Sequence, residues 1–478
     1  MKIDYLDEPD LEFGSGYRHI DIRHGLMNAG PLDILSPKPR SISVAIIGTN
    51  QTIEGLGRWL ERCRNEVPAK ASEYPRLFPR FPGFAPDVAF HSTLLLENRM
   101  QRPLSERSLS IAMASSRPAT TVQSCVAMFL EELNYLAETH RPDVVICAPT
   151  NEMWESFHNK DIGTGFNAAQ TDVAFDFHDL LKAKGMKEHV PLQLVWPYTY
   201  DPGKRRRQKR RTNLLRGQQD EATRAWNLHT ALYYKAGGTP WRLIRDPTRL
   251  TTCFVGVAFF QSLAGDRLMT SLAQLFNERG EGVVVRGGTA SVSKDDLQPH
   301  LDQEGAKQLL HDALTIYRRE HKTVPARLVL HKTSKFSHAE MSGFREALLD
   351  WRIESADLLS ISDSETKLFR EQSHPPLRGT FLSLDARTHV FYTRGSVDFF
   401  QVYPGQYIPS PLLIRCEDTE QTPRFLAAEI LELTKMNWNT TQFDGRDPIT
   451  TRAAHHVGAI LKYLEPTDVA EAAYAFYM

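Results

Sequence analysis

The stretches SVAIIGT (Ser43–Thr49), PDVVICAPT (Pro142–Thr150) and LQLVWPY (Leu192–Tyr198) decide the fold of the first half of the chain. Each is a short apolar run, which is typical of a strand that is buried on both faces of a sheet. Helical patterns over Ile53–Cys63 and Thr121–His140 separate these strands. Strands that alternate with helices in this way predict a parallel, doubly wound α/β sheet.

The second half of the chain is predicted to be a second α/β unit with additional, antiparallel strands. Its expected strands include TTCFVGVAFF (Thr251–Phe260), GVVVRGG (Gly282–Gly288) and ARLVLHKTS (Ala326–Ser334). The segment LMTSLAQLFNERG (Leu268–Gly280) is predicted to be helical. The 478 residues therefore divide into an irregular lead-in over 1–40, a first domain over 41–245 and a second over 246–478.

Charge and composition exclude several classes of protein. The chain carries 57 basic and 58 acidic residues, so any binding of nucleic acid must come from local basic patches. No apolar run is long enough to span a membrane, and the acidic N-terminus does not resemble a signal peptide. The five cysteines form no CxxC pair, which argues against structural zinc. We expect a soluble, cytoplasmic protein without a membrane partner.

The most biased segment is KRRRQKRR (Lys204–Arg211), with seven cations in eight residues. Such a run can hold a phosphate through bidentate arginine contacts, or it can be a solvated loop. Gln219 and Lys235 flank the helical stretch that follows, and a loop and a helix can converge on one anion. Lys235 can equally be a cation that complements the helix dipole at a C-terminus.

The strands of the second half offer no set of catalytic groups. Ribonuclease-H-like nucleases hold two metal ions with carboxylates on such strands. This chain has Ala258 in the middle of one strand, and HKTS (His331–Ser334) at the end of another contains no carboxylate. No GxSxG, HExxH, P-loop or GxGxxG motif is present.

Several runs together resemble a known family. The most specific is LTKMNWNTTQFDGRDPITTRAAHHVGAILKYL (Leu433–Leu464), and with VGVAFF, PARLVLHKTSKF and PPLRGTFLSLD it looks like the PIWI domain of Argonaute proteins. ALYYKAGGTPW (Ala231–Trp241) resembles the junction before that domain, and SVAIIGT with PDVVICAPT resembles a MID domain. The chain is similar to short prokaryotic Argonautes. This implies a Rossmann-like MID domain followed by a ribonuclease-H-like PIWI domain.

The resemblance also implies a pocket for the 5′-phosphate of a guide strand. Lys235 matches the pocket lysine, and Gln219 matches the pocket glutamine with Gln218 as a competitor. Within the basic run Lys209 is the best match, while Lys204, Arg207 and Arg211 stay open. The family often adds a divalent cation, here Mg²⁺, which the C-terminal carboxylate of Met478 would help to bind at the phosphate rather than for catalysis.

The cleavage site of active Argonautes does not carry over. Ala258 stands in place of the first aspartate and Thr333 in place of a later one. His455 falls where a fourth group would be, and Glu278 and Glu281 lie near the position of the mobile glutamate without its motif. One ligand cannot hold two metal ions, so we expect a nuclease-inactive PIWI domain and no enzymatic activity in this chain.

The implied function is that of a guide-dependent sensor. A short 5′-phosphorylated guide RNA would pair with a single-stranded DNA target and activate a separate APAZ-domain effector. That effector would be a sirtuin-like or TIR-type NADase, or else a DNase. Target binding would activate it through oligomerisation, and the outcome would be abortive antiviral or anti-plasmid immunity. Two alternatives are a guide-directed, metal-dependent nuclease with misplaced carboxylates and a non-guided RNA-binding α/β protein.

Overall fold

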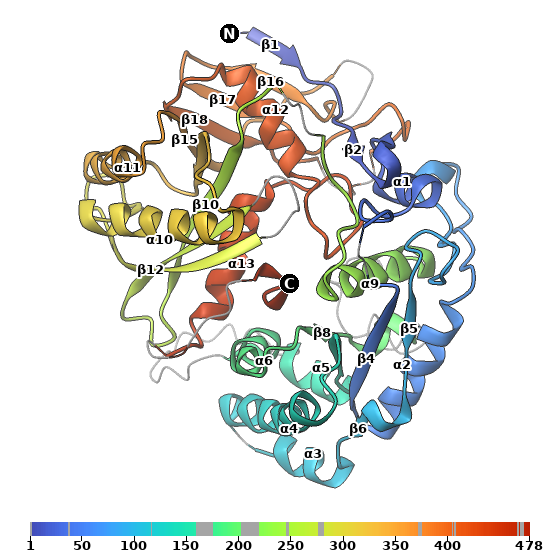
Figure 1. The fold of residues 1–478 in the computed structure, drawn as a ribbon. Coiled ribbons are helices and arrows are strands. Elements are labelled where there is room, and N and C mark those ends of the chain that lie inside the picture. Colours follow the sequence, from blue (N-terminus) through green and yellow to red (C-terminus); the bar gives the residue numbers. More distant parts are fainter. Residues whose placement is uncertain are drawn as a thin grey trace.

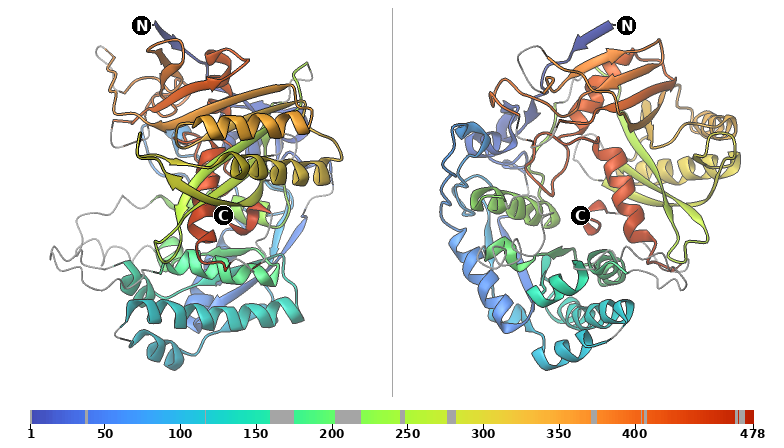
Figure 2. Two further views of the ribbon diagram at one scale, coloured as in Figure 1. Left: turned by 90° about the vertical axis from the view of Figure 1, so that its left-hand side faces the viewer. Right: turned by 180° about the vertical axis from the view of Figure 1, so that it is seen from behind.

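The fold consists of two α/β lobes, and the last residues of the chain lie between them (Figure 1). The view from behind agrees with this arrangement (Figure 2). The computed structural model describes residues 2–36, 39–115, 117–158, 175–201, 219–244, 248–275, 282–370, 375–403, 405, 408–465, 468 and 473–478.

The first lobe is built on a parallel five-stranded sheet. Its strands are β4 (Ser41–Gly48), β5 (Thr93–Leu95), β6 (Gln101–Pro103), β7 (Val144–Ala148) and β8 (Leu192–Leu194). The order is β5-β4-β7-β8, and β6 also pairs with β4. Every pairing is parallel, so the prediction of a parallel sheet in the first half is confirmed.

Helices cover this sheet and follow the expected alternation. The helix α2 (Asn50–Arg62) follows β4, α4 (Pro118–Thr139) precedes β7, and α6 (Phe177–Gly185) precedes β8. Thr49 caps α2 because its side chain accepts from the backbone N–H of Thr52. The remaining helices of this lobe are α3 (Glu106–Met113), α5 (Asn151–His158), α7 (Pro197–Tyr200) and α9 (Glu221–Lys235).

The second lobe is built on a ten-stranded mixed sheet in the order β1-β16-β17-β18-β15-β14-β10-β11-β12-β13. The neighbours β10, β14 and β15 are parallel, and the other pairings are antiparallel. The strands are β1 (Lys2–Tyr5), β10 (Thr252–Gln261), β11 (Leu268–Leu275), β12 (Gly282–Val292), β13 (Pro299–His300), β14 (Arg327–Lys332), β15 (Ser355–Asp363), β16 (Thr380–Ser383), β17 (Thr388–Phe391) and β18 (Leu412–Asp418).

Helices pack on both faces of this sheet. The helices α10 (Gln303–His321) and α11 (His338–Asp350) share one core with Val255 and Val257 of β10. The helix α13 (Ile449–Leu461) packs on β10 and β11 from the other face, where Ala258 is buried with Ala454 and Val457, and α12 (Pro423–Leu433) belongs to the same core. The α/β fold of the second half is therefore confirmed.

The predicted helix over Leu268–Gly280 is wrong where the structure describes it. Residues Leu268–Leu275 form the strand β11, while 276–280 lie outside the described residues. Leu272 pairs with Val257 on one side and with Val285 on the other. Because both edges of β11 are bonded to neighbouring strands, tertiary pairing overrides the helical preference of its leucines, methionine and alanine.

The lead-in is ordered rather than irregular. Its strand β1 pairs with β16 of the second lobe, and α1 (Ile22–Ala29) is capped by the buried side chain of Asp21. The short strands β2 (Leu11–Glu12), β3 (Arg18–His19) and β9 (Arg242–Leu243) form a separate small sheet. The expected boundary after residue 245 lies outside the described residues. In the described part of the chain, no helix has both the length and the apolar character needed to cross a bilayer.

The close contact between β10 and α13 gives a stability prediction. A Cβ atom on Gly256 would lie 2.1 Å from the Thr450 carbonyl oxygen, so Gly256→Ala must push α13 away from the sheet. We expect it to lower the free energy of unfolding by about 1–3 kcal/mol in urea titrations. Gly288→Ala is the matched control, because nothing lies within 4 Å of its added Cβ. Equal urea midpoints for the two variants would contradict the close packing of α13 on β10.

Candidate functional site

The helix α9 carries a lysine into the interior between the two lobes. It begins after Asp220, whose side chain accepts from the backbone N–H of Thr223 at 3.0 Å. Most of its residues are buried, which is typical of a helix that is enclosed on all sides. Lys235 is its last residue, and only 5% of Lys235 is exposed.

The ammonium group of Lys235 joins two distant parts of the chain. Its Nζ donates to the backbone oxygen of Leu192 at 3.0 Å and to Oε1 of Gln193 at 2.5 Å, both on β8. It also donates to a main-chain oxygen of Met478, the last residue, at 2.9 Å. Lys235 therefore ties β8, the edge strand of the first sheet, to the final segment of the second lobe.

The side chain of Lys182 on α6 reaches the same backbone oxygen of Leu192. Its Nζ donates to the Leu192 oxygen at 3.0 Å and to the Phe476 oxygen at 3.5 Å, and the residue is 3% exposed. Two ammonium groups therefore share one backbone carbonyl. The sequence reasoning did not identify Lys182, because nothing in DLLKAKGMK separates it from the more exposed Lys184 and Lys187.

Among the buried cations of the described residues, these two lysines differ from the others because no side-chain carboxylate pairs with them. The others are each paired with a side-chain carboxylate: Arg23 with Asp21, Arg327 with Asp357 and Glu429, Lys332 with Glu340, and Arg378 and Lys435 both with Glu8. Within the described ranges, no carboxylate side chain pairs with Lys182 or Lys235. Buried charges are normally paired, so this pair is suited to an anion from outside.

The pKa values follow from this arrangement. Burial lowers the pKa of Lys182 to about 8. Burial and then the adjacent charge of Lys182 hold the pKa of Lys235 well below its ordinary value. A bound anion would relieve both effects, since a negative charge favours the protonated form of each amine. A phosphate group, which is multiply charged and rich in acceptors, fits the site chemically.

Of the other predicted phosphate ligands, Gln219 alone lies among the described residues. Lys204, Arg207, Lys209 and Arg211 all lie outside the described residues. Gln219 is exposed just before α9, and its Oε1 accepts from Asn227 at 3.1 Å. Because α9 has 15 residues, Gln219 and Lys235 lie at opposite ends of a helix about 22 Å long. The expectation that Gln219 and Lys235 converge on one anion is therefore not met.

Two of the three degenerate cleavage positions lie side by side. The parallel strands β10 and β14 bring Ala258 next to Thr333, whose N–H donates to the Val257 oxygen at 3.1 Å. On the neighbouring strand β11, Ser271 pairs with Ala258, and its hydroxyl donates to the Ala454 oxygen at 2.7 Å. These described neighbours contribute no carboxylate to the position. Glu278 and Glu281 lie outside the described residues.

His455 is not part of that group. It is exposed on α13, whereas its neighbour Ala454 is the residue that faces β10 and β11. Adjacent residues of a helix point about 100° apart, which explains why one faces the sheet and the next faces away. The structure therefore does not place His455 beside Ala258 and Thr333.

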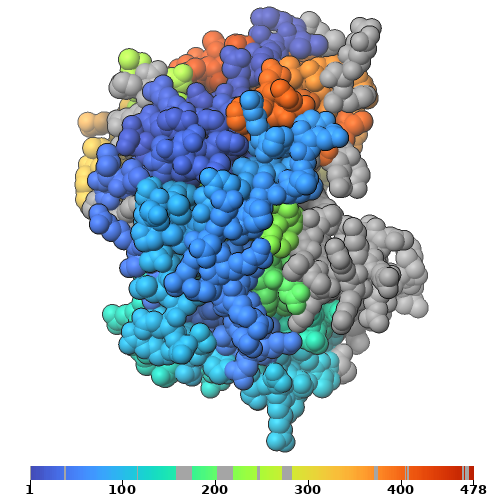
Figure 3. Space-filling model, turned by 90° about the vertical axis from the view of Figure 1, so that its right-hand side faces the viewer, coloured from blue at the N-terminus to red at the C-terminus, as the bar shows by residue number. Residues whose placement is uncertain are grey.

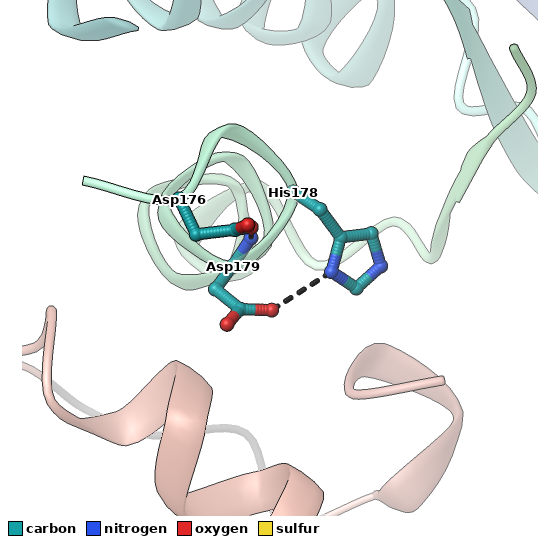
Figure 4. Close-up of side chains that lie close together, drawn as sticks. All are labelled: Asp176, His178 and Asp179. Atoms are coloured by element: carbon teal, nitrogen blue, oxygen red, sulfur yellow. Dashed lines mark hydrogen bonds and ion pairs between the residues drawn. The ribbon is translucent and has the colours of Figure 1, made fainter. Parts of the chain in front are cut away.

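A group of potential metal ligands lies at the start of α6 (Figure 4). The ligand atoms of Asp176, His178 and Asp179 lie within 4.8 Å of one another. Asp176 caps the helix by accepting from the Asp179 N–H at 2.9 Å, and His178 Nδ1 lies 2.8 Å from Asp179 Oδ1. The His178 ring also stacks on His456 of α13, with centroids 5.9 Å apart. Capping and stacking account for these contacts without a metal ion.

The expected Mg²⁺ position at Met478 can be tested against its donors. The oxygens of Leu192, Gln193 and Met478 are of the kind that Mg²⁺ binds. All three accept from the ammonium group of Lys235, however, and Leu192 also accepts from Lys182. The donor set therefore fits a divalent cation only when an anion first offsets the charge of the two lysines.

Comparison with solved structures shows the same fold. The chain superposes on Clostridium butyricum Argonaute bound to a guide DNA and a 19-mer target DNA with a TM-score of 0.62 at 14% identity, over 97% of this chain and 53% of that one. Drosophila Piwi gives 0.60 at 12% identity, over 99% and 56%. Aa-Ago with externally bound siRNA gives 0.61 at 14% identity, over 99% and 56%.

These structures confirm the predicted fold class, a Rossmann-like lobe followed by a ribonuclease-H-like lobe, which this chain shares with the Argonaute and Piwi chains. The chain spans little more than half the length of the solved chains that it matches. No family model matches the sequence, and no curated protein matches it significantly.

The lysine pair predicts a pH dependence of stability. The pKa of Lys182 is about 8 in the folded chain and about 10.5 as a model amine, so the unfolded chain binds more protons between these values. The free energy of unfolding should therefore rise as the pH increases across this window. Each pKa unit corresponds to about 1.4 kcal/mol, so the full shift of Lys182 corresponds to about 3 kcal/mol. Lys182→Met should remove this rise, when the free energy of unfolding is compared at pH 8 and pH 10.5.

The exposed Lys187 provides the control. Lys187→Met should retain the wild-type pH dependence, because it removes an exposed lysine and leaves the buried pair intact. Other groups titrate near pH 10, so the comparison rests on the difference between each variant and the wild type. If the free energy of unfolding of Lys182→Met changed with pH in parallel with that of the wild type, the result would contradict an unpaired buried charge at Lys182.

Proposed function

We propose that this chain is a guide-dependent nucleic-acid sensor that anchors the 5′-phosphate of a short guide RNA with Lys182 and Lys235. The observation that carries the proposal is the pair of buried ammonium groups without a side-chain carboxylate, at the junction of the two lobes. A terminal phosphate offers more negative charge than a backbone diester, so such a site favours a strand end. The basic run over 204–211 would add further contacts.

The Argonaute-like fold supports this proposal. One structure of the same fold holds a guide DNA and a target DNA, and another holds an externally bound siRNA. For this chain we propose an RNA guide and a single-stranded DNA target, with specificity supplied by base pairing rather than by side chains. When phosphate is bound, Mg²⁺ would join it at the oxygens around Met478 and neutralise part of its charge.

We further propose that the chain itself does not cleave its target. Ala258 and Thr333 occupy adjoining strand positions where a two-metal nuclease needs carboxylates. Ser271, which faces Ala258, is also neutral. Target recognition must then act through another protein. By resemblance to short prokaryotic Argonautes, that protein is an APAZ-domain effector, first a sirtuin-like or TIR-type NADase and second a DNase, which acts in abortive defence.

The anchor is tested by comparing 5′-phosphorylated and 5′-hydroxyl oligonucleotides of one sequence. The wild type should prefer the phosphorylated strand, and Lys235→Ala should remove most of this preference. Loss of one charged hydrogen bond costs roughly 1.5–3 kcal/mol, which is about ten- to a hundredfold in Kd. Lys182→Ala should have a similar effect.

The control for the anchor is Lys187→Ala, which removes a positive charge from the exposed surface of the same lobe. It should keep the wild-type ratio of the two dissociation constants. An unchanged ratio in both Lys182→Ala and Lys235→Ala would show that the phosphate binds elsewhere or that no phosphate is recognised.

The sensor itself is tested by purifying the chain from its native host and sequencing the nucleic acid that accompanies it. We expect short 5′-phosphorylated RNAs and an APAZ-domain protein, identified by mass spectrometry. Addition of a complementary single-stranded DNA should then raise the NADase activity of the complex.

Two results would contradict the sensor proposal. Metal-dependent cleavage of the target by the isolated chain would favour an active nuclease. Purification without small nucleic acids, together with equal binding of phosphorylated and hydroxylated RNA, would favour a non-guided RNA-binding protein.

A further inference from the structure

A second pocket lies at the other end of α9, where the lead-in, the first lobe and the second lobe meet. Its volume is about 330 Å³, which is in the range of pockets for small ligands. Gln219, Thr223 and Asn227 line it from α9 and the residues before it, and loops of the second lobe contribute Arg394 and Phe443. In Figure 3, the green surface of α9 shows between the blue first lobe and the grey residues, below the orange loops.

The acidic groups of this pocket are already occupied by partners. Both carboxylate oxygens of Asp220 accept from Thr223, one from its backbone N–H and one from its hydroxyl. Asp444 accepts from Arg394 Nε at 3.2 Å and from Gln442 Nε2 at 2.7 Å. Asp444 is therefore paired with a cation, whereas Asp220 is held by two neutral donors and keeps its negative charge.

Several donors of the pocket, in contrast, have no acceptor among the described residues. Lys70 is exposed and forms no ion pair there; its ammonium group lies 4.5 Å from the centre of the Phe78 ring. Arg394 uses only Nε, which leaves both terminal nitrogens of its guanidinium group unpaired in the described chain. Gln219 accepts through Oε1, so its amide N–H groups remain available. These unused donors favour an anion.

The apolar side of the pocket is aromatic. Phe78 is half-buried, and Phe443 stacks on Phe400 with ring centroids 4.2 Å apart. A ligand that fits both sides combines a negative charge with a flat ring. Unpaired nucleotides have this combination, since their bases stack on aromatic side chains and their phosphates bind lysine and arginine.

We propose that this pocket holds one unpaired nucleotide of the bound strand, with its phosphate on Lys70 and Arg394 and its base against Phe78 and the amide of Gln219. This inference rests on the proposed function, because it assumes that the chain binds a nucleic-acid strand. It also gives Gln219 a role at a second site about 22 Å from Lys235, in place of the role that the sequence suggested. The two sites are separate and can be tested separately.

The charge of the second site is tested by salt titration of strand binding. Lys70→Gln removes one exposed cation and should lower the slope of log K against log salt by about 0.7, the value for one phosphate of a single strand. The matched control is Lys294→Gln, which removes an exposed lysine from the β12–β13 turn and should leave the slope unchanged. The preference for a 5′-phosphate should persist in Lys70→Gln, because Lys235 is intact.

The base is tested by a scan in which one nucleotide at a time is replaced by an abasic unit. In the wild type, one position away from the 5′-end should weaken binding by about ten- to a hundredfold. In Phe78→Ala the same abasic unit should have little further effect, since its stacking partner is already absent. Circular dichroism and the retained 5′-phosphate preference would show that this variant is folded.

Three outcomes would overturn the proposal. One is a salt slope for Lys70→Gln equal to that of the wild type. Another is a scan in which wild type and Phe78→Ala respond alike at every position. The third is a result in which Lys70→Gln weakens the binding of a free nucleoside monophosphate but leaves the binding of the strand unchanged. Failure of the guide-sensor proposal would instead appear as a wild type that binds phosphorylated and hydroxylated strands equally.

Discussion

Two buried positive charges at one carbonyl oxygen impose the strongest constraint on this structure. Lys182 and Lys235 approach Leu192 from different helices, and both also donate to the last residues of the chain. Burial of an ammonium group is costly unless negative charge compensates it. The chain provides such compensation at Lys332 and Lys435 with side-chain carboxylates, but here with backbone and amide oxygens and an oxygen of the last residue. The two lysines therefore lower the stability of the folded chain unless a further negative charge joins them.

This arrangement also connects the two lobes. The strand β8 is the outermost strand of the first sheet, and it presents Leu192 and Gln193 to the two lysines. The final segment of the second lobe reaches the same edge and supplies Phe476 and Met478. An anion bound there would contact groups from both lobes at once. Binding at the anchor would then stabilise the relative position of the two lobes.

The sequence predicts the architecture better than it predicts the site. Buried strands such as Val144–Ala148 are recognisable from a run of apolar, mostly β-branched residues, and the parallel order follows from alternation with helices. The strand β11 was misassigned because its pairing with two neighbours cannot be read from its own residues. Lys235 was identified through the resemblance of the segment around it. Lys182 carries no local signal, since its role arises only from the packing of α6 against β8.

The helix α9 determines how the two candidate sites relate to each other. In its middle the side chains of Trp226, Leu228 and Leu232 are all buried, so the rest of the protein encloses the helix and it behaves as a rigid element. One end presents Lys235 to the anchor, and the other end lines the pocket with Thr223 and Asn227. The distance between the sites is therefore fixed by helix length rather than by loops. A protein of nearly neutral net charge can bind a polyanion in this way, because its unpaired cations stand at a fixed spacing instead of covering the surface.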